Sequence, residues 1–198
     1  FKPTNLSLPE RAYRCHVAEF FLERYKLPQN LKPSLAVTQG VRQSLTHLFS
    51  TLDKWIIPSD QYPFYQQTLT AQGKSFSKYS TLNEAELFKN LSNGTLLLTY
   101  PLKLGNRNYT EKEFLSLKEF LAQDKSNLLV IDLVYWLNDS FPEEILELYK
   151  SDQVILLYSF SKKFLLPNYG GFTLLPSTSL GREVAKSFTA LEKNEEKL

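Results

Sequence analysis

Side chains of the kinds that do chemistry follow several short apolar segments of this sequence. Lys162 comes just after the apolar run Val154–Tyr158, and the hydroxyl residues Ser159 and Ser161 precede it. A lysine amine at the exit of a buried strand becomes a nucleophile when its surroundings lower its pKa. Most lysines are solvated surface charges, so Lys162 taken alone is also explained by that role.

A second candidate is a carboxylate at the end of another apolar run. Asp132 directly follows Leu128–Ile131, and Tyr135 stands three residues further on. A carboxylate at the end of a buried strand is costly unless a cation or a hydrogen-bond donor meets it. Asp132 therefore either pairs with a structural partner such as an arginine or binds a ligand.

Two further segments suggest ligand contacts. Gly40 opens a predicted helix, whose first N–H groups, those of Val41 and Arg42, and whose dipole favour a phosphate. Ordinary turn chemistry also accounts for this glycine. Tyr62 stands in a predicted loop after the next strand, where its ring either stacks on a flat ligand or closes over the core.

Short apolar strands and amphipathic helices alternate along the chain and must position these residues. The predicted strands are Leu35–Thr38, Trp55–Ile57, Ser75–Tyr79, Leu96–Tyr100, Leu128–Asp132, Val154–Tyr158 and Gly171–Leu175. The predicted helices are Leu8–Tyr25, Gly40–Leu52, Asn83–Asn90, Thr110–Leu121, which begins with a capping box, Glu143–Lys150 and Leu180–Lys197. This alternation predicts an α/β fold, a three-layer α/β/α sandwich with a mostly parallel sheet. Ligands of such sheets bind at the carboxyl ends of the strands, where the candidate residues stand.

Length and composition suit one folded unit. The chain has 198 residues, of which 42% are hydrophobic and 22% charged, and this excludes a disordered tail or a fibre. We predict a single unit over 1–198, with an N-terminal helix in 1–30, an α/β core in 35–175 and a C-terminal helix in 178–198. The chain begins at Phe1 and contains no methionine, so we expect that its first residue is not a native start.

Charge and cysteine usage restrict the partners and the compartment. A formal net charge of +2 is too small to indicate nucleic acid or an anionic membrane as partner. The single cysteine, Cys15, and the lack of any apolar run of membrane-spanning length predict a cytoplasmic protein. His16 and His47 stand in no metal-ligand arrangement, so no metal site is expected.

In chain order, these segments resemble the class I/II (fold-type I) family of pyridoxal-phosphate-dependent aminotransferases, with the histidinol-phosphate aminotransferase type the most similar. The matching segments, which lie between Leu35 and Phe172, are Thr38-Gln39-Gly40-Val41-Arg42-Gln43-Ser44-Leu45 for T-x-G-x-x-x-A-L, Tyr62-Pro63-Phe64-Tyr65 for Y-P-x-Y, Tyr100-Pro101 in the place of N-P-x-N-P-T-G, Asp132-Leu133-Val134-Tyr135 for D-E-x-Y, and Ser159-Phe160-Ser161-Lys162 for S-F-S-K. The resemblance implies the fold of that family's large domain, without its small C-terminal domain.

The resemblance also implies a pyridoxal 5'-phosphate cofactor and a role for each candidate near its ring. Lys162 would form a Schiff base with the cofactor aldehyde and then carry the proton between substrate and cofactor. Asp132 would pair with the pyridinium nitrogen and keep the ring protonated. Tyr135 would donate a hydrogen bond to the ring's phenolate oxygen, and Tyr62 would stack on the ring.

The remaining implied contacts hold the cofactor phosphate. The residues concerned offer backbone N–H groups or hydroxyls and are Gly40, Val41, Arg42, Ser159 and Ser161. The implied reaction is aminotransfer between amino acids and 2-oxo acids, with decarboxylation or lyase chemistry as alternatives. The resemblance implies a homodimer, because the family builds its active sites at a dimer interface.

The sequence departs from the family's pattern at several positions. Pro101–Gly105 contains no asparagine for the phenolate oxygen, and Leu133 replaces the glutamate after the pyridinium aspartate. The arginine that clamps the phosphate is absent from Asn168–Phe172, which leaves Lys163 and Arg42 as candidates to supply part of its charge.

These departures keep other functions open. A non-catalytic descendant of the family, acting as a binding or scaffold protein, is the main alternative to an enzyme. An unrelated flavodoxin-like or nucleotide-binding α/β module ranks last, because the sequence has neither a G-x-G-x-x-G nor a G-x-x-x-x-G-K-[ST] motif.

Overall fold

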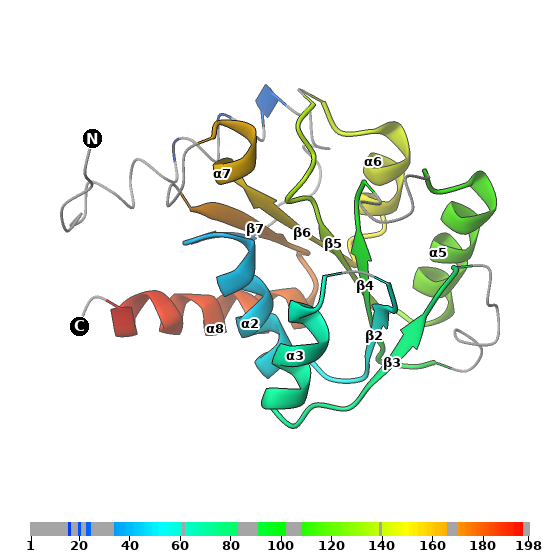
Figure 1. Cartoon of the computed structure of the whole chain (residues 1–198), viewed down its shortest axis with the longest axis horizontal. Coiled ribbons are helices and arrows are strands. Elements are labelled where there is room, and N and C mark those ends of the chain that lie inside the picture. The colour runs from blue at the N-terminus through cyan, green and yellow to red at the C-terminus, as the bar shows by residue number, and fades with distance from the viewer. Residues whose placement is uncertain are drawn as a thin grey trace.

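The computed structural model describes residues 34–60, 62–82, 91–101, 108–138, 140–165 and 170–195, together with residues 16, 20, 23 and 24. Within these ranges a seven-stranded sheet carries helices on both faces (Figure 1). The strands are β1 (Ser34–Thr38), β2 (Trp55–Pro58), β3 (Phe76–Tyr79), β4 (Thr95–Thr99), β5 (Leu128–Asp132), β6 (Val154–Ser159) and β7 (Gly171–Leu175). The helices are α2 (Val41–Thr51), α3 (Phe64–Ala71), α5 (Glu111–Gln123), α6 (Glu143–Tyr149), α7 (Phe160–Lys163) and α8 (Ser179–Glu195). The predicted helix Asn83–Asn90, and Leu8–Tyr25 apart from the single residues named above, lie outside the described ranges.

The strand order is β1-β7-β6-β5-β4-β2-β3, and only β7 runs against its neighbours. The central strands β4, β5 and β6 are buried along their whole length, which is why they appear in the sequence as continuous apolar runs. The predicted mostly parallel sheet is therefore confirmed. All six parallel strands end at the same edge of the sheet, and β7 begins there.

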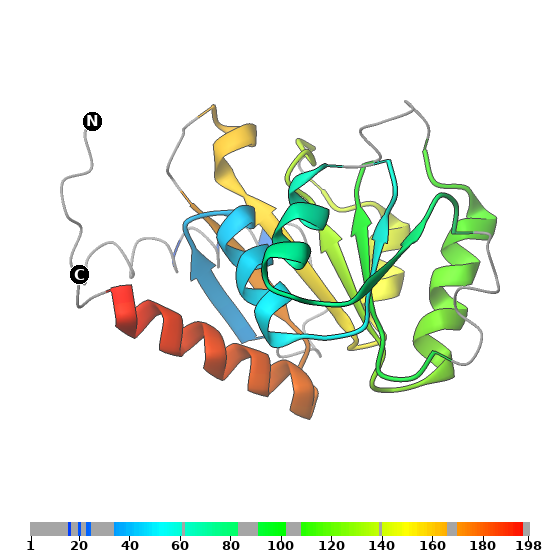
Figure 2. The same ribbon diagram turned by 60° about the horizontal axis from the view of Figure 1, so that its bottom comes forward.

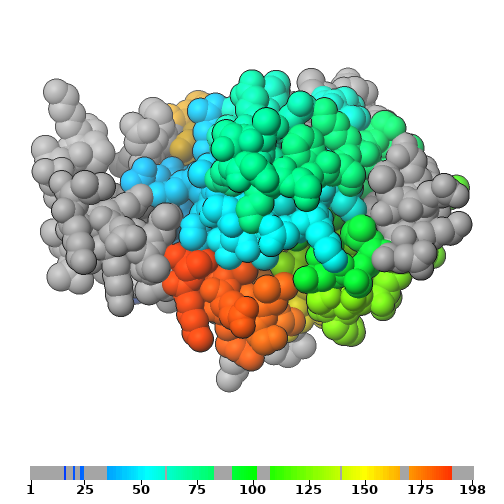
Figure 3. Space-filling view, turned by 90° about the horizontal axis from the view of Figure 1, so that it is seen from below, coloured from blue at the N-terminus to red at the C-terminus, as the bar shows by residue number. Residues whose placement is uncertain are grey.

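Helices cover both faces of the sheet and give three layers. The helices α2, α3 and α8 pack on one face through buried side chains such as Leu48, Leu69 and Phe188. The helices α5 and α6 pack on the other face, where Phe120 and Ile145 are fully buried. Figure 2 shows α2 and α8 side by side on the near face, and residues of α2, α3 and α8 form much of the surface in Figure 3. The predicted three-layer α/β/α sandwich is confirmed.

Two helices were not predicted from the sequence. The sequence predicts a loop with aromatic residues after β2, whereas in the structure α3 begins at Phe64 and buries Tyr65 and Leu69 on one face. The short α7 places Lys162 in a single helical turn directly after β6. Both helices are brief, and a period of 3.6 residues is hard to recognise in one or two turns.

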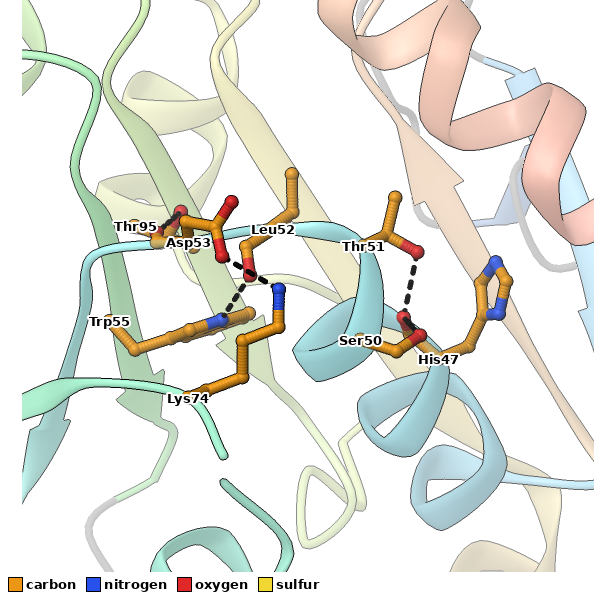
Figure 4. Close-up of polar contacts among 8 residues, drawn as sticks. All are labelled: His47, Ser50, Thr51, Leu52, Asp53, Trp55, Lys74 and Thr95. Atoms are coloured by element: carbon orange, nitrogen blue, oxygen red, sulfur yellow. Dashed lines mark hydrogen bonds and ion pairs between the residues drawn. The ribbon is translucent and has the colours of Figure 1, made fainter. Parts of the chain in front are cut away.

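Polar contacts fix the start of β2 at the edge of the sheet opposite the strand carboxyl ends (Figure 4). The indole N–H of Trp55 donates to the carbonyl oxygen of Leu52 at 3.0 Å. The hydroxyl of Thr95 donates to the carbonyl oxygen of Asp53 at 3.1 Å, and the ammonium of Lys74 lies 2.6 Å from the Asp53 carboxylate. These contacts tie β2 to β4 and so set where β2 delivers its carboxyl end.

Candidate functional site

The structure brings the residues singled out in the sequence to one edge of the sheet. Thr38, at the end of β1, and Ser159, at the end of β6, both pair with Gly171, the first residue of β7. Asp132, at the end of β5, pairs with Thr99 of β4. The candidates Gly40, Val41 and Arg42 follow β1, Tyr62 follows β2, Tyr135 follows β5, and Ser161 and Lys162 follow Ser159. This edge is where ligands of parallel sheets bind.

Asp132 is buried at this edge, with only 2% of its surface exposed. The Tyr65 hydroxyl donates to Oδ2 at 2.6 Å, and the Val134 N–H donates to Oδ1 at 3.0 Å. Burial raises the pKa of Asp132 to about 6, although both hydrogen bonds lower it. No cation within the described ranges contributes to the ionisation of this carboxyl. Its partners are thus two hydrogen-bond donors rather than the arginine considered as a structural partner.

Tyr65, which donates to Asp132, is the residue that the sequence interpretation missed. Its ring is buried, and its hydroxyl oxygen lies 3.3 Å from the hydroxyl oxygen of Thr99. Burial and the Asp132 charge raise the pKa of Tyr65 well above its usual value, so the phenol keeps its proton and can donate it. The spacing of Tyr65 and Leu69 was the available signal, because residues four apart share a helix face.

Tyr62 lies just before α3 and contacts both Arg42 and Tyr65. Its ring is 41% exposed, stacks on Phe64 with ring centres 5.7 Å apart, and presents an edge-to-face contact to Tyr65 at 5.8 Å. Arg42 donates a hydrogen bond to the Tyr62 hydroxyl. The Arg42 guanidinium carbon lies 5.7 Å from the Phe64 ring centre. A row of aromatic rings therefore extends from Arg42 to Tyr65, the donor to Asp132.

The turn between β1 and α2 has open space above a helix start. Gly40 has φ of 131°, in the region that favours glycine, and a Cβ added there would meet no atom within 4 Å. The Ser44 hydroxyl donates to the Thr38 hydroxyl oxygen at 3.0 Å and accepts from Thr173 at 2.9 Å. These bonds hold the turn against the sheet. The first N–H groups of α2, which follow Gly40 directly, have no acceptor within the helix.

Lys162 reaches the edge of the sheet from α7. The Ser159 hydroxyl caps this short helix and accepts from the Ser161 N–H at 3.3 Å. Lys162 is exposed, and its Nζ lies 6.0 Å from the centre of the Tyr135 ring. The neighbouring Lys163 donates to the carbonyl oxygen of Asn138 at 2.8 Å. Lys162 and Lys163 thus both contact the segment that follows β5, Lys162 near Tyr135 and Lys163 at Asn138.

This residue set fits pyridoxal phosphate. A planar pyridinium would supply the cation that Asp132 lacks among the described residues. The open space at Gly40 suits a phosphate on the first N–H groups of α2, and Lys162 offers an amine. In the described ranges, no three or more His, Cys, Asp or Glu residues are grouped so that they could hold a metal ion. No helix of the described part is long and apolar enough to cross a membrane.

Solved structures of pyridoxal-phosphate-dependent enzymes share this fold. Aspartate aminotransferase of Thermotoga maritima superposes with a TM-score of 0.70 at 20% identity, over 93% of this chain and 52% of the other. The Escherichia coli protein YbdL, for which a methionine aminotransferase function is reported, gives 0.66 at 16% identity, over 91% and 52%. The pyridoxal-phosphate-bound C-S lyase of Staphylococcus hominis gives 0.66 at 16% identity, over 97% and 56%.

The chain thus has the fold of the large domain of pyridoxal-phosphate-dependent transferases. It spans about half the length of these solved chains. No protein-family model matches the sequence, and no curated protein matches it either. The likeness to the histidinol-phosphate aminotransferase type therefore stays a prediction.

Proposed function

We propose that this chain is the cofactor-binding part of a pyridoxal-phosphate-dependent enzyme of the aminotransferase type, acting on an amino acid and a 2-oxo acid. The observation that carries the proposal is the buried carboxylate of Asp132, which has hydrogen-bond donors but no cation among the described residues. It stands at the same sheet edge as the amine of Lys162. A pyridinium nitrogen and an aldehyde on one small ring satisfy both groups.

Each of four residues has a proposed role at the cofactor ring. When bound, pyridoxal phosphate supplies an aldehyde and an electron-withdrawing ring. Asp132 would stabilise the protonated ring nitrogen, and Tyr62 would stack on the ring. Tyr135, whose ring centre lies 6.0 Å from Lys162 Nζ, would donate to the phenolate oxygen. Lys162 would offer its amine to the aldehyde and would carry a proton to or from the substrate.

The proposed phosphate contacts come from the segments that follow β1 and β6, the two strands that pair with β7. The N–H groups of Val41 and Arg42 behind Gly40, and the hydroxyls of Ser159 and Ser161, are the proposed donors. Arg42 also supplies positive charge in place of the arginine that the resemblance leads one to expect, because its guanidinium is already held at this edge by Tyr62.

The test is a spectroscopic titration with pyridoxal phosphate. We expect a visible absorption band, which borohydride converts into a stable secondary amine between the cofactor carbon and Lys162 Nζ. Lys162→Ala should abolish the band and the mass increase on the Lys162 peptide. Lys163→Ala is the matched control, because Lys163 is the next residue and donates instead to Asn138. A band that persists in Lys162→Ala would refute the proposed role of Lys162.

A non-catalytic binding protein is the second candidate. It is favoured by the exposure of Lys162 and by the absent phenolate asparagine and phosphate-clamping arginine. The two candidates differ in single-turnover behaviour. After the cofactor is loaded, a screen of amino acids should convert the bound cofactor to its amine form if the chain is an enzyme, and should leave its spectrum unchanged if it only binds.

We further propose that the chain works as a cytoplasmic homodimer. Large apolar side chains are exposed near the candidate site, with exposures of 55% for Leu137, 44% for Phe164 and 84% for Leu165. Burying them between two copies would remove apolar surface from water. Light scattering at several concentrations, with and without cofactor, is expected to give twice the monomer mass. A strict monomer under both conditions would contradict this assembly.

A further inference from the structure

The hydrogen bond between Tyr65 and Asp132 joins two buried groups from adjacent layers, a helix and the sheet on which it packs. Tyr65 stands on α3 and Asp132 at the end of β5, with 2% of each residue exposed. The distance of 2.6 Å between Tyr65 Oη and Asp132 Oδ2 is short, as expected for a hydrogen bond to a charged acceptor. Thr99, on the strand beside Asp132, lies 3.3 Å from the same Tyr65 oxygen.

Several groups face Asp132, and their chemistry determines what Tyr65 does. The residues paired with Asp132 on the adjacent strands, Thr99 and Leu157, carry no charge. Burial opposes ionisation of Asp132, and only the Tyr65 hydroxyl and the Val134 N–H favour it among the described residues. The Tyr65 hydroxyl can be removed by a side-chain substitution, whereas the Val134 N–H belongs to the backbone.

The charged and titratable side chains on the surrounding elements contact other groups. Arg42, at the start of α2, bonds to the Tyr62 hydroxyl. Lys162, on α7, lies at 6.0 Å from the Tyr135 ring centre. Tyr109, which precedes α5, donates to the backbone carbonyl of Thr99 at 2.9 Å. None of the three is among the groups that determine the ionisation of Asp132.

We propose that Tyr65 is a positioning residue for the cofactor ring: its hydroxyl fixes Asp132 Oδ2 and keeps this carboxyl ionised before any cofactor binds. This inference rests on the proposed function, in which ionised Asp132 receives the pyridinium. Without the hydroxyl, a buried carboxyl reverts to its neutral form near neutral pH. The chain would then bind the ring only in the fraction of molecules that remain ionised.

The experiment compares the 198-residue chain with Tyr65→Phe and with Tyr79→Phe. Tyr79 is a matched control, because it is also buried and its hydroxyl donates at 2.9 Å to the backbone carbonyl of Leu97 rather than to Asp132. The first readout is the carbon NMR titration of the Asp132 carboxyl in the cofactor-free protein, with Asp132→Asn to assign the signal. A hydrogen bond to a charged group is worth enough to move the midpoint upward by about 1–2 pH units in Tyr65→Phe.

The second readout is the affinity for pyridoxal phosphate as a function of pH. With a carboxyl midpoint near pH 6 in the parent chain, Tyr65→Phe should bind about 3- to 25-fold more weakly at about pH 6.5. The ratio should shrink to less than about twofold at about pH 8.5, because the carboxyl is then ionised in both proteins. A merely structural loss would weaken binding equally at both pH values.

The outcomes separate this inference from the proposed function. An Asp132 midpoint in Tyr65→Phe equal to that of the parent chain overturns the role of Tyr65, even if the parent chain binds the cofactor. Failure of every variant and of the parent to bind pyridoxal phosphate overturns the proposed function, while the carboxyl titration still measures what Tyr65 does. An equal upward movement in Tyr79→Phe would also overturn the inference, because the effect would then be unspecific.

Discussion

Asp132 carries a cost in stability that its proposed role requires, and replacing it by asparagine should make this cost measurable. The pKa of Asp132 is about 6 in the folded chain, compared with an ordinary value of 3.8. The folded state therefore holds its proton more tightly than the unfolded state. The stabilising effect of this proton is fully present below about pH 3.8 and is lost as the pH rises through about 6.

The size of the effect follows from the difference of about 2 pKa units, which corresponds to about 3 kcal/mol. Asparagine has the shape of the protonated acid and no charge. The amide oxygen of asparagine can accept from the Val134 N–H, and its amide N–H can donate to the Tyr65 hydroxyl oxygen. The Tyr65 hydroxyl can then donate to the Thr99 hydroxyl oxygen, 3.3 Å away. Asp132→Asn should therefore stabilise the cofactor-free chain by about 3 kcal/mol above about pH 7 and by close to zero below about pH 4.

The assay is urea unfolding of both proteins between about pH 4 and pH 8, followed by circular dichroism. Asp53→Asn serves as control, because the Asp53 side chain is 74% exposed in its ion pair with Lys74 and should change stability by less than about 1 kcal/mol. A difference between parent and Asp132→Asn that does not vary with pH, or a less stable variant at about pH 7.5, would refute the reasoning. The same variant should lose affinity for pyridoxal phosphate, so stability and function are expected to change in opposite directions.

Further substitutions probe the parts of the fold that support the site. Gly170→Ala combines a φ of +74° with a Cβ only 2.4 Å from a backbone oxygen of β1, so urea unfolding should show a loss of about 2–5 kcal/mol. Gly73→Ala, with φ of +66° and open space, should lose only about 1–2 kcal/mol. Burial lowers the pKa of His47, which bonds to Ser187 at 2.7 Å, so the neutral ring supports the fold and stability should fall as the pH drops below about 6.5. His47→Gln should flatten that part of the stability profile measured against the parent. Thr110→Ala removes the capping box of α5 and should cost about 1 kcal/mol in the same unfolding assay, whereas an unchanged midpoint would show that the cap contributes nothing.

The elements of the fold could be predicted where local sequence is sufficient to define them. The apolar runs of β4, β5 and β6 indicated buried strands, and each one is buried along its length. Thr110 and Glu113 indicated where α5 begins, and their side chains form both bonds of the capping box. The predicted parallel strands were enough to place Asp132 and Lys162 at one edge of the sheet, because each residue follows the carboxyl end of such a strand and parallel strands end on the same side.

The connections between layers could not be predicted in this way. Tyr65 and Asp132 are 67 residues apart in the chain, and their contact depends on α3, whose eight residues are too short for a clear periodic pattern. The hydrogen bond from Arg42 to Tyr62 likewise joins two segments that only packing brings together. The strand β7 pairs with both β1 and β6 and is antiparallel to both. Its own composition does not indicate this direction, which depends on where the chain re-enters the sheet.

The sequence by itself thus indicated which residues are candidates to hold a ring and an aldehyde, and at which edge of the sheet they stand. Only the tertiary structure decided that the buried carboxylate is held by a phenol rather than by an arginine. The physical reason is that the cost of burying Asp132 depends on the groups within hydrogen-bonding distance. The Val134 N–H is local to Asp132, but the Tyr65 hydroxyl comes from a helix whose packing no local pattern of residues encodes.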